Sequence, residues 1–296
     1  MRHSPPERAA MISQRFVKDF EPGMRTRAFI GLVRLGAFHS SGTSLSLTAG
    51  RLEIMCGRFT LKTDPKVIAS QFKVSSIAIL EGRIADLTSP SVSVDQVDSE
   101  IFKPNFNVAP THQIPAIVSQ GEETLLTAFA WGLVPTWAKD PAIGSRMINA
   151  RSETAAEKPS FRSALVKRRC IVPADGWYEW QGSPGSKTPF YFSPMSNSVM
   201  GFAGIYESWK TPDGQLLWSA AILTQQARPD FSYIHDRMPV LVAHELEKTW
   251  LSAPASPLND VLDAASSVDI QAWQVSSAVG NVKNNSADLT LNQTLF

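Results

Sequence analysis

A cysteine directly after a methionine, in Met55-Cys56, has the most distinctive chemistry in this sequence. If Met55 is the start and is removed, Cys56 carries a free α-amino group beside its thiol. Such a 1,2-aminothiol condenses with an aldehyde through its amine to an imine. The thiol then closes a five-membered thiazolidine ring on the same carbon. An internal cysteine lacks that amine, so this chemistry is expected only of a chain that starts at Cys56.

Three further polar residues interrupt or follow short apolar and aromatic runs: Asn149, Glu179 and His235. A polar group in such a run is costly to bury without a partner or a function. Together with Cys56 they supply a thiol, an amide, a carboxylate and an imidazole, which are the parts of a nucleophilic site. Each also has a structural alternative. Glu179 can pair with an arginine, His235 can cap a helix or bond a core carbonyl, and Asn149 can hold a turn.

The same ambiguity applies to the arginines and tryptophans of these segments. The arginines are either partners of buried acids or phosphate contacts, and the tryptophans are either core residues or platforms for nucleobases. They are Arg58, Arg151 and Arg237 in the first group, and Trp131 and Trp137 in the second. Cys170, in an expected strand, is interpreted as a small core residue.

Net charge separates the first 54 residues from the rest. They carry eight Lys/Arg and four Asp/Glu, a charge of +4, which leaves −3 for the remainder of a chain whose total is +1. A slightly acidic body is not typical of a strong non-specific nucleic-acid binder. Any DNA contact would need its basic residues concentrated in one groove.

The chain has only two cysteines, Cys56 and Cys170, which argues against a disulfide framework and a cysteine-based zinc site. No metal or organic cofactor is expected. No apolar run reaches the length of a membrane span, and the Ala28–Phe38 run lacks the cleavage pattern of a secretory signal. These features predict a cytoplasmic protein.

The elements that would position these residues are short strands with few helices, an α+β pattern with a curved, barrel-like, mostly antiparallel sheet and peripheral helices. Residues 74–103 are interpreted as a surface insertion, and Asn105–Pro110 as a turn. Helices are expected at Pro65–Phe72, after Met147–Glu153, at Phe161–Val166 and at His244–Leu251, with a further turn at Val261–Ala265. Strands are expected at Cys56–Leu61, Ile114–Ser119, Leu125–Trp131, Arg169–Pro173, Gly176–Trp180, Phe190–Phe192, Met200–Tyr206 and Leu217–Thr224. Trp273–Val275 and Val279–Val282 are expected to close the domain.

Residues 1–54 show no sustained helical or strand period. Three interpretations compete: a start assigned too far upstream, a disordered basic extension of the kind that contacts nucleic acid, and an organelle-targeting peptide. The four acidic residues count against the last. The expected organisation is this extension, a catalytic domain over residues 55–285, and a tail over residues 286–296.

Seven motifs occur in an order that resembles the SOS-response-associated peptidase (SRAP) family, whose members process abasic sites and shield damaged single-stranded DNA. The resemblance covers about residues 55–285, and the motifs are specific only jointly. They are Met55-Cys56-Gly57-Arg58-Phe59, Asn107-Val108-Ala109-Pro110, Trp131-Gly132, Asn149-Ala150-Arg151 with Glu153-Thr154, Asp175-Gly176-Trp177-Tyr178-Glu179-Trp180, His235-Asp236-Arg237-Met238-Pro239 and Gly280-Asn281-Val282-Lys283-Asn284.

The resemblance implies a role for each matching residue. Cys56, as the amino-terminal residue, would attack the ring-opened aldehyde of an abasic deoxyribose. Glu179 would hold or deprotonate the amine, and His235 would act as general acid/base on the sugar ring oxygen and assist reversal. Asn149 would orient the thiol or the sugar. Flanking phosphates and bases would be contacted by Arg58, Arg151, Arg237 and Trp131.

The leading hypothesis is therefore a monomeric DNA–protein crosslinking enzyme. It would take single-stranded DNA with abasic sites as its partner, and would associate with the nucleoid on damaged DNA. A peptidase activity could expose Cys56, because with residues 1–54 attached the nitrogen of Cys56 is an amide and no thiazolidine forms. Two alternatives remain: a thiol hydrolase using Cys56, His235 and Asn149, and a non-covalent single-strand DNA binding module.

Overall fold

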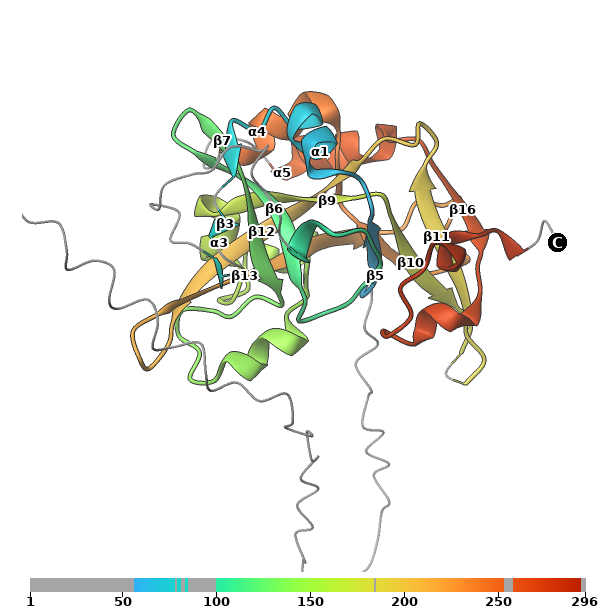
Figure 1. The fold of residues 1–296 in the computed structure, drawn as a ribbon, viewed down its shortest axis with the longest axis horizontal. Helices are drawn as coiled ribbons and strands as arrows, with labels where there is room; N and C mark the ends of the chain where they lie inside the picture. The colour runs from blue at the N-terminus through green and yellow to red at the C-terminus, as the bar shows by residue number, and fades with distance from the viewer. Residues whose placement is uncertain are drawn as a thin grey trace, which may run out of the picture. The chain divides into compact units, whose positions relative to one another are not determined.

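A computed structural model describes residues 56–77, 79–80, 83–84, 100–183, 185–252 and 258–293. The extension over residues 1–54 and Met55 lie outside these ranges. Within them the chain is α+β with mostly antiparallel sheets, as the sequence predicted (Figure 1).

A barrel forms the larger part of the described structure. Strands β13, β12, β9, β6 and β7 follow one another in hydrogen-bonded order, and a parallel β13–β7 pairing closes the ring. Strands β14, β15, β8 and β2 extend it. Its members are β2 (Ser76–Ile77), β6 (Gln113–Gln120), β7 (Glu123–Trp131), β8 (Asn149–Arg151), β9 (Arg169–Ala174), β12 (Met200–Lys210), β13 (Leu216–Gln226), β14 (Arg237–Pro239) and β15 (Leu241–Val242).

A second, antiparallel sheet of five strands has the order β16-β11-β10-β1-β5. Its bounds are β1 (Phe59–Leu61), β5 (Asn105–Val108), β10 (Gly176–Gln181), β11 (Thr188–Pro194) and β16 (Ile270–Gln274). Gly176 is required where these strands meet, because a Cβ there would collide with the Phe192 carbonyl and the Tyr191 ring. The Tyr191 hydroxyl hydrogen-bonds Thr60 of β1 at 2.8 Å, so this close approach ties β1 to β10 and β11.

The helices are short and lie outside the sheets. Helix α1 (Pro65–Gln71) begins as predicted, with Pro65 in its first turn and Asp64 accepting a hydrogen bond from the Lys66 amide at 2.7 Å. In Figure 1, α1 lies beside α4 and α5 in the view. The other helices are α2 (Ser152–Ala155), α3 (Arg162–Lys167), α4 (Glu247–Leu251) and α5 (Leu258–Ala264). The 3-10 turns are η2 (Glu100–Phe102), η3 (Pro141–Arg146), η4 (His244–Leu246), η5 (Ala265–Ser267), η6 (Ser277–Gly280) and η7 (Ala287–Thr290).

Four sequence-based expectations need correction. Asn105–Val108 is strand β5 rather than a turn, because it pairs with β1. Ser76–Ile77 pairs with β7 and Ile77 is buried, so this part of the expected 74–103 insertion belongs to the barrel. A small hairpin, β3 (Ile79–Leu80) and β4 (Arg83–Ile84), follows, and the rest of that segment up to residue 99 lies outside the described residues. Residues 258–264 form a helix rather than a turn. The first strand begins at Phe59 and not at Cys56.

One hydrophobic core fills the barrel and extends between the two sheets. Phe59 of β1 packs edge-to-face on Trp131, with ring centroids 5.2 Å apart, and Trp177 of β10 stacks on Phe192 at 4.6 Å. A smaller cluster includes Leu289, so part of the expected tail packs against the five-stranded sheet. Among the described residues no helix is long and apolar enough to cross a membrane.

Candidate functional site

The pairing of β1 with β10 brings Cys56 to Glu179. The strands are antiparallel with Phe59 opposite Trp177, and the Tyr178 amide donates to the Arg58 carbonyl at 3.0 Å. Continued backwards, this register carries the residues that precede β1 alongside Glu179. Cys56 itself has a backbone φ of +46°, a value that residues other than glycine rarely adopt. The backbone therefore turns at Cys56.

The carboxylate of Glu179 accepts hydrogen bonds from both the backbone N–H and the thiol of Cys56. Both residues are almost fully buried, at 4% exposed for Cys56 and 2% for Glu179. One carboxylate oxygen, Oε1, has no hydrogen-bond partner among the described residues, which leaves Oε2 to receive both bonds. The cysteine nitrogen and sulfur thus converge on a single oxygen.

Burial sets the protonation of this pair. Loss of solvation raises the pKa of Glu179 from its ordinary value of 4.5 to about 8; the hydrogen bonds from Cys56 oppose this and the charge of Asp236 adds to it. Burial also raises the pKa of the Cys56 thiol well above its ordinary value, and the neighbouring Glu179 raises it further. At neutral pH both groups are therefore predominantly protonated.

His235 lies on a turn that covers the same face of the sheet. The Gln181 side chain, two residues beyond Glu179 on β10, donates to the Tyr233 carbonyl at 3.0 Å. The charges of Asp236 and Arg237 both act on Cys56. The structure thus brings together Cys56, Glu179 and the segment that carries His235.

The His235 ring has two available partners at Nδ1. The Arg237 amide donates to Nδ1 at 3.0 Å, and the Asp236 carboxylate lies 3.1 Å from the same nitrogen. A neutral ring accepts from the amide and carries its proton on Nε2, whereas a protonated ring pairs with the carboxylate. Both protonation states therefore have a partner, which suits a residue that transfers protons.

Asn149 lies at the end of the barrel where Arg237 also lies. Strand β8 pairs in parallel with β13, with Asn149 opposite Ile222 and Arg151 opposite Thr224, and β14 pairs with the same end of β13. The Asn149 side chain is half-buried. Its place on a strand, rather than in a turn, fixes its direction.

The three arginines differ in their present partners. Arg237 pairs through both terminal nitrogens with Glu153, at 2.6 and 2.9 Å, and donates to the Thr224 carbonyl at 2.7 Å. Arg58 donates to Asn107 Oδ1 at 2.8 Å and to the Val279 carbonyl at 2.9 Å. Arg151 is exposed, and its side chain makes no hydrogen bond or ion pair with the described residues.

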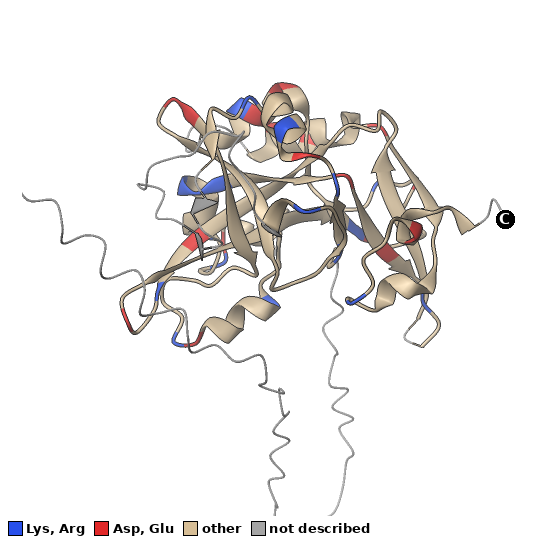
Figure 2. Ribbon diagram, in the orientation of Figure 1, with Lys and Arg blue, Asp and Glu red and all other residues tan. Residues whose placement is uncertain are grey.

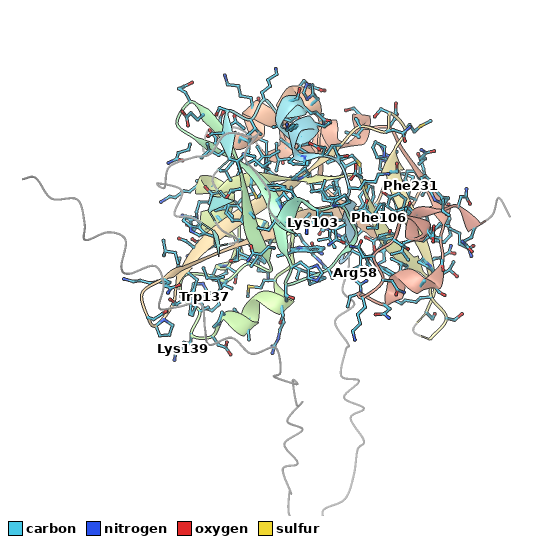
Figure 3. All side chains as sticks on the ribbon, viewed as in Figure 1. Arg58, Lys103, Phe106, Trp137, Lys139 and Phe231 are labelled. Atoms are coloured by element: carbon cyan, nitrogen blue, oxygen red, sulfur yellow. The ribbon has the colours of Figure 1, made fainter. Side chains whose placement is uncertain are left out.

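The two tryptophans separate clearly. Trp131 is 1% exposed and its indole donates to the Ile148 carbonyl at 2.9 Å, so no ring face is open to a base. The expectation that Trp131 stacks on bases is therefore wrong for this conformation, and its alternative as a core residue holds. Trp137 is 56% exposed and lies beside Lys139 (Figure 3). Cys170 is fully buried in β9, as expected.

Asn107 belongs to one of the seven sequence motifs, and in the structure it is the centre of a hydrogen-bond network. It is 1% exposed, and its Oδ1 accepts from Arg58. Its Nδ2 donates to the carbonyls of Val279, Asn281 and Asn284 at 3.2, 3.0 and 3.0 Å. This fastens the 279–284 segment to β5 and, through Arg58, to the residues just before β1. The available signal was its place in the motif Asn107-Val108-Ala109-Pro110.

A barrel with an added antiparallel sheet, and a buried cysteine–glutamate pair where they meet, defines an α+β protein with a cysteine-centred site. A solved protein from Bacteroides thetaiotaomicron has this fold, with a TM-score of 0.64, 24% identity, and coverage of 80% of this chain and 99% of that one. A second, from Bordetella bronchiseptica, covers 75% of this chain with a TM-score of 0.56 and 22% identity.

The family model described as SOS response associated peptidase (SRAP) matches residues 55–282, and the chain belongs to that family. Abasic site processing protein YoqW of Bacillus subtilis is 41% identical over 239 residues, covering 79% of this chain and 98% of that protein. Abasic site processing protein YoaM of the same organism is also 41% identical, covering 79% and 97%. Abasic site processing protein HMCES of Xenopus tropicalis is 30% identical, covering 64% and 67%.

Proposed function

We propose that this protein recognises abasic sites in single-stranded DNA and joins them covalently to Cys56 as a thiazolidine, which shields the lesion during the response to DNA damage. The observation that carries this is the convergence of the Cys56 nitrogen and sulfur on the Glu179 carboxylate. A thiazolidine needs that nitrogen and that sulfur on one carbon. The names of the relatives support the choice of substrate.

The order of steps follows from the protonation of the thiol. Because burial and Glu179 keep the thiol protonated, the amine attacks first. Its lone pair adds to C1′ of the open-chain sugar, and loss of water from the carbinolamine gives an imine. The sulfur then adds to the same carbon, and the thiol proton passes to the nitrogen through Glu179. The net reaction consumes one aldehyde and one aminothiol and releases one water.

Glu179 is suited to the proton transfers of this sequence. An acid with a pKa near the working pH is most effective as both donor and acceptor. Protonated, it can deliver a proton to the departing hydroxyl of the carbinolamine. Ionised, it can take the proton of the thiol.

We assign His235 to the opening of the sugar. Only the open form of an abasic deoxyribose offers an aldehyde, and opening requires a proton on the ring oxygen. With Nδ1 accepting from the Arg237 amide, the neutral ring holds its proton on Nε2. Asn149 is assigned to orienting the sugar.

The reaction requires a free amine on Cys56, so residues before it must be absent. The family match begins at residue 55, and the similarity to YoqW accounts for 98% of that relative. We propose either that translation starts at Met55, which is then removed, or that the protein hydrolyses the peptide bond before Cys56. In the second route water adds to the Met55 carbonyl and the carbon–nitrogen bond breaks. Protonated Glu179, already bonded to the Cys56 nitrogen, supplies the proton to the leaving amine.

DNA would be held by local contacts rather than by overall charge. Basic and acidic positions are interspersed over the ribbon (Figure 2). Arg151 is exposed without a partner among the described residues, and we assign it to a phosphate. Arg237 would bind a phosphate after releasing its ion pair with Glu153. Arg58 would bind a phosphate through the N–H groups that do not donate to Asn107 or Val279. Trp137 takes the base-stacking role expected of Trp131.

The alternatives fit the site less well. A thiol hydrolase needs a thiolate, usually formed beside a histidine or another cation. Here the nearest ionisable partner of Cys56 is a carboxyl group, which raises the pKa of the thiol. A non-covalent DNA binding module would gain nothing from burying that pair.

The test uses a single-stranded oligonucleotide with one abasic site, and denaturing electrophoresis. Protein that begins at Cys56 should form an adduct that withstands denaturation, whereas the same protein with an acetylated α-amine, or with residues still attached before Cys56, should form none. Cys56→Ser keeps the amine, so its imine should be retained only when a borohydride reductant is added. Cys170→Ala, at a buried cysteine away from the site, is the matched control and should behave as wild type. Equal adduct from acetylated protein would refute the proposal.

A further inference from the structure

Tyr233 is an exposed aromatic side chain at the edge of the site, and no role has been given to it. Its residue is 62% exposed, and its side chain makes no hydrogen bond or ring contact with the described residues. It lies two residues before His235, and its carbonyl accepts the hydrogen bond from Gln181 at 3.0 Å. Since Gln181 and Glu179 are two apart on β10, their side chains share one face of the sheet. The Tyr233 backbone therefore lies on the same face of the sheet as the Glu179 side chain, at the rim of the site.

The turn that carries Tyr233 is anchored by the buried side chains and hydrogen bonds of its other residues. Ile234 is 3% exposed, and the Phe231 ring packs edge-to-face on Phe192 with centroids 5.4 Å apart. Phe231 (labelled in Figure 3) therefore lies against β11, the strand that carries Phe192. Arg228, at the start of the turn, donates to the carbonyls of Ser266 and Val268, each at 2.9 Å. With its neighbours anchored in the protein, the backbone at Tyr233 is held in place, so a base that binds the exposed ring need not order the turn.

We propose that Tyr233 forms a stacking position for the nucleobase adjacent to the abasic nucleotide, on the side of the site bounded by the β10–β11 hairpin. This inference rests on the proposed function, because it assumes that an abasic sugar occupies the site beside Cys56. An abasic nucleotide has no base of its own, so recognition must use the neighbouring bases and phosphates. Stacking on an aromatic ring accepts any base and suits a lesion that arises in any sequence.

The charge of this rim favours the same ligand. Lys187 is exposed at the end of the hairpin, and its charge reaches Glu179. A cation there attracts the phosphate that accompanies the stacked base. The exposed Tyr233 ring and a lysine whose charge reaches Glu179 supply the two kinds of contact, stacking and charge, that single-stranded nucleic acid requires.

The test measures binding without the covalent step. Oligonucleotides carry a tetrahydrofuran analogue of the abasic site, which has no aldehyde, and bind the full chain non-covalently. Tyr233→Ala should weaken binding about tenfold, a typical effect of losing one stacked base. Tyr233→Phe, which keeps the ring, should stay within about twofold of wild type. Met195→Ala, at a residue 61% exposed just beyond the end of β11, is the matched control and should change nothing.

The decisive arm removes the neighbouring base on one side of the lesion at a time. If Tyr233 stacks on that base, its removal weakens wild type but not Tyr233→Ala, on one side only. Losses that add on both sides, or an unchanged affinity for Tyr233→Ala, would overturn the inference. Failure of the protein that begins at Cys56 to crosslink a true abasic site while this coupling is present would refute the thiazolidine and leave the stacking position standing. Crosslinking without the coupling would refute the stacking position alone.

Discussion

Glu179 receives the backbone N–H and the thiol of Cys56 on one buried carboxylate. As a consequence, the Glu179 carboxyl and the Cys56 thiol are both predominantly neutral at physiological pH. The acid can then donate a proton, and the thiol reacts only after the amine has. The pairing of β1 with β10 makes this contact possible, since it places the residue before the strand beside the middle of β10.

The first prediction concerns stability and pH. Burial raises the pKa of Glu179 from 4.5 to about 8, so the folded state favours the protonated acid. The stability that protonated Glu179 contributes is therefore fully present below the pKa of this carboxyl group in the unfolded state. It is lost as pH rises through the pKa of the group in the folded state. In the full chain, Glu179→Gln should gain stability relative to wild type between these values, by at most roughly 1.4 kcal/mol per pH unit. Urea denaturation across this range measures it. Parallel stability profiles for the two proteins would contradict the assignment.

The second prediction concerns His235. His235→Ala in the protein that begins at Cys56 should slow crosslinking by about 10²- to 10⁴-fold, the usual contribution of a positioned acid or base. Affinity for the tetrahydrofuran oligonucleotide should be unchanged, because the ring transfers a proton rather than binds. Single-turnover rates and binding isotherms separate the two effects. Asp236→Asn, at a carboxylate 80% exposed, should have the smaller effect on rate. A loss confined to affinity would exclude a role in proton transfer.

The third prediction concerns the ion pair between Arg237 and Glu153. Glu153→Gln releases the guanidinium, so affinity for single-stranded DNA should rise. The slope of log affinity against log salt should steepen by about 0.7, the value for one phosphate contact. Glu153 is 49% exposed, so the cost in stability should be at most about 1 kcal/mol. An unchanged salt slope would mean that Arg237 is a structural residue and contacts no phosphate.

The fourth prediction separates the two tryptophans. Trp131→Phe removes the indole donor to the Ile148 carbonyl, which keeps its bond from the Ile222 amide, and leaves a cavity in the core. It should lower stability by about 1–3 kcal/mol. Trp137→Ala, at an exposed position, should change stability by less than about 0.5 kcal/mol. For single-stranded DNA the pattern should be reversed: Trp137→Ala should lose affinity, and folded Trp131→Phe should keep it. Thermal denaturation and binding isotherms on both variants check this, and a DNA defect confined to Trp131→Phe would reverse the assignment.

Local patterns predicted much of this structure because they arise from neighbouring residues. Pro65 after Asp64 indicated the start of α1. The aromatic neighbours of Glu179 indicated that this carboxyl group is buried. The family resemblance joined such fragments into a site. Strand β5 was missed because its two asparagines suggest a turn, and only its pairing with β1 makes it a strand.

Partners distant in the sequence could not be predicted. Arg237 and Glu153 are 84 positions apart, and Arg58 meets the Val279 carbonyl 221 positions away. Nor does composition reveal which of Trp131 and Trp137 is buried, since both stand in one turn-rich stretch. These features depend on which distant segments pair in space. In the barrel β13 lies beside β7 and β8, and in the second sheet β1 lies beside β5.

The central claim is that one carbon of the abasic sugar is bonded to both the nitrogen and the sulfur of Cys56. The most direct measurement is tandem mass spectrometry of the amino-terminal peptide after protein beginning at Cys56 has reacted with abasic single-stranded DNA. The account predicts a peptide carrying the sugar remnant with the loss of one water, with neither its amine nor its thiol open to alkylation. An adduct on a lysine or on Cys170, or a modified Cys56 whose thiol still reacts with iodoacetamide, would contradict it.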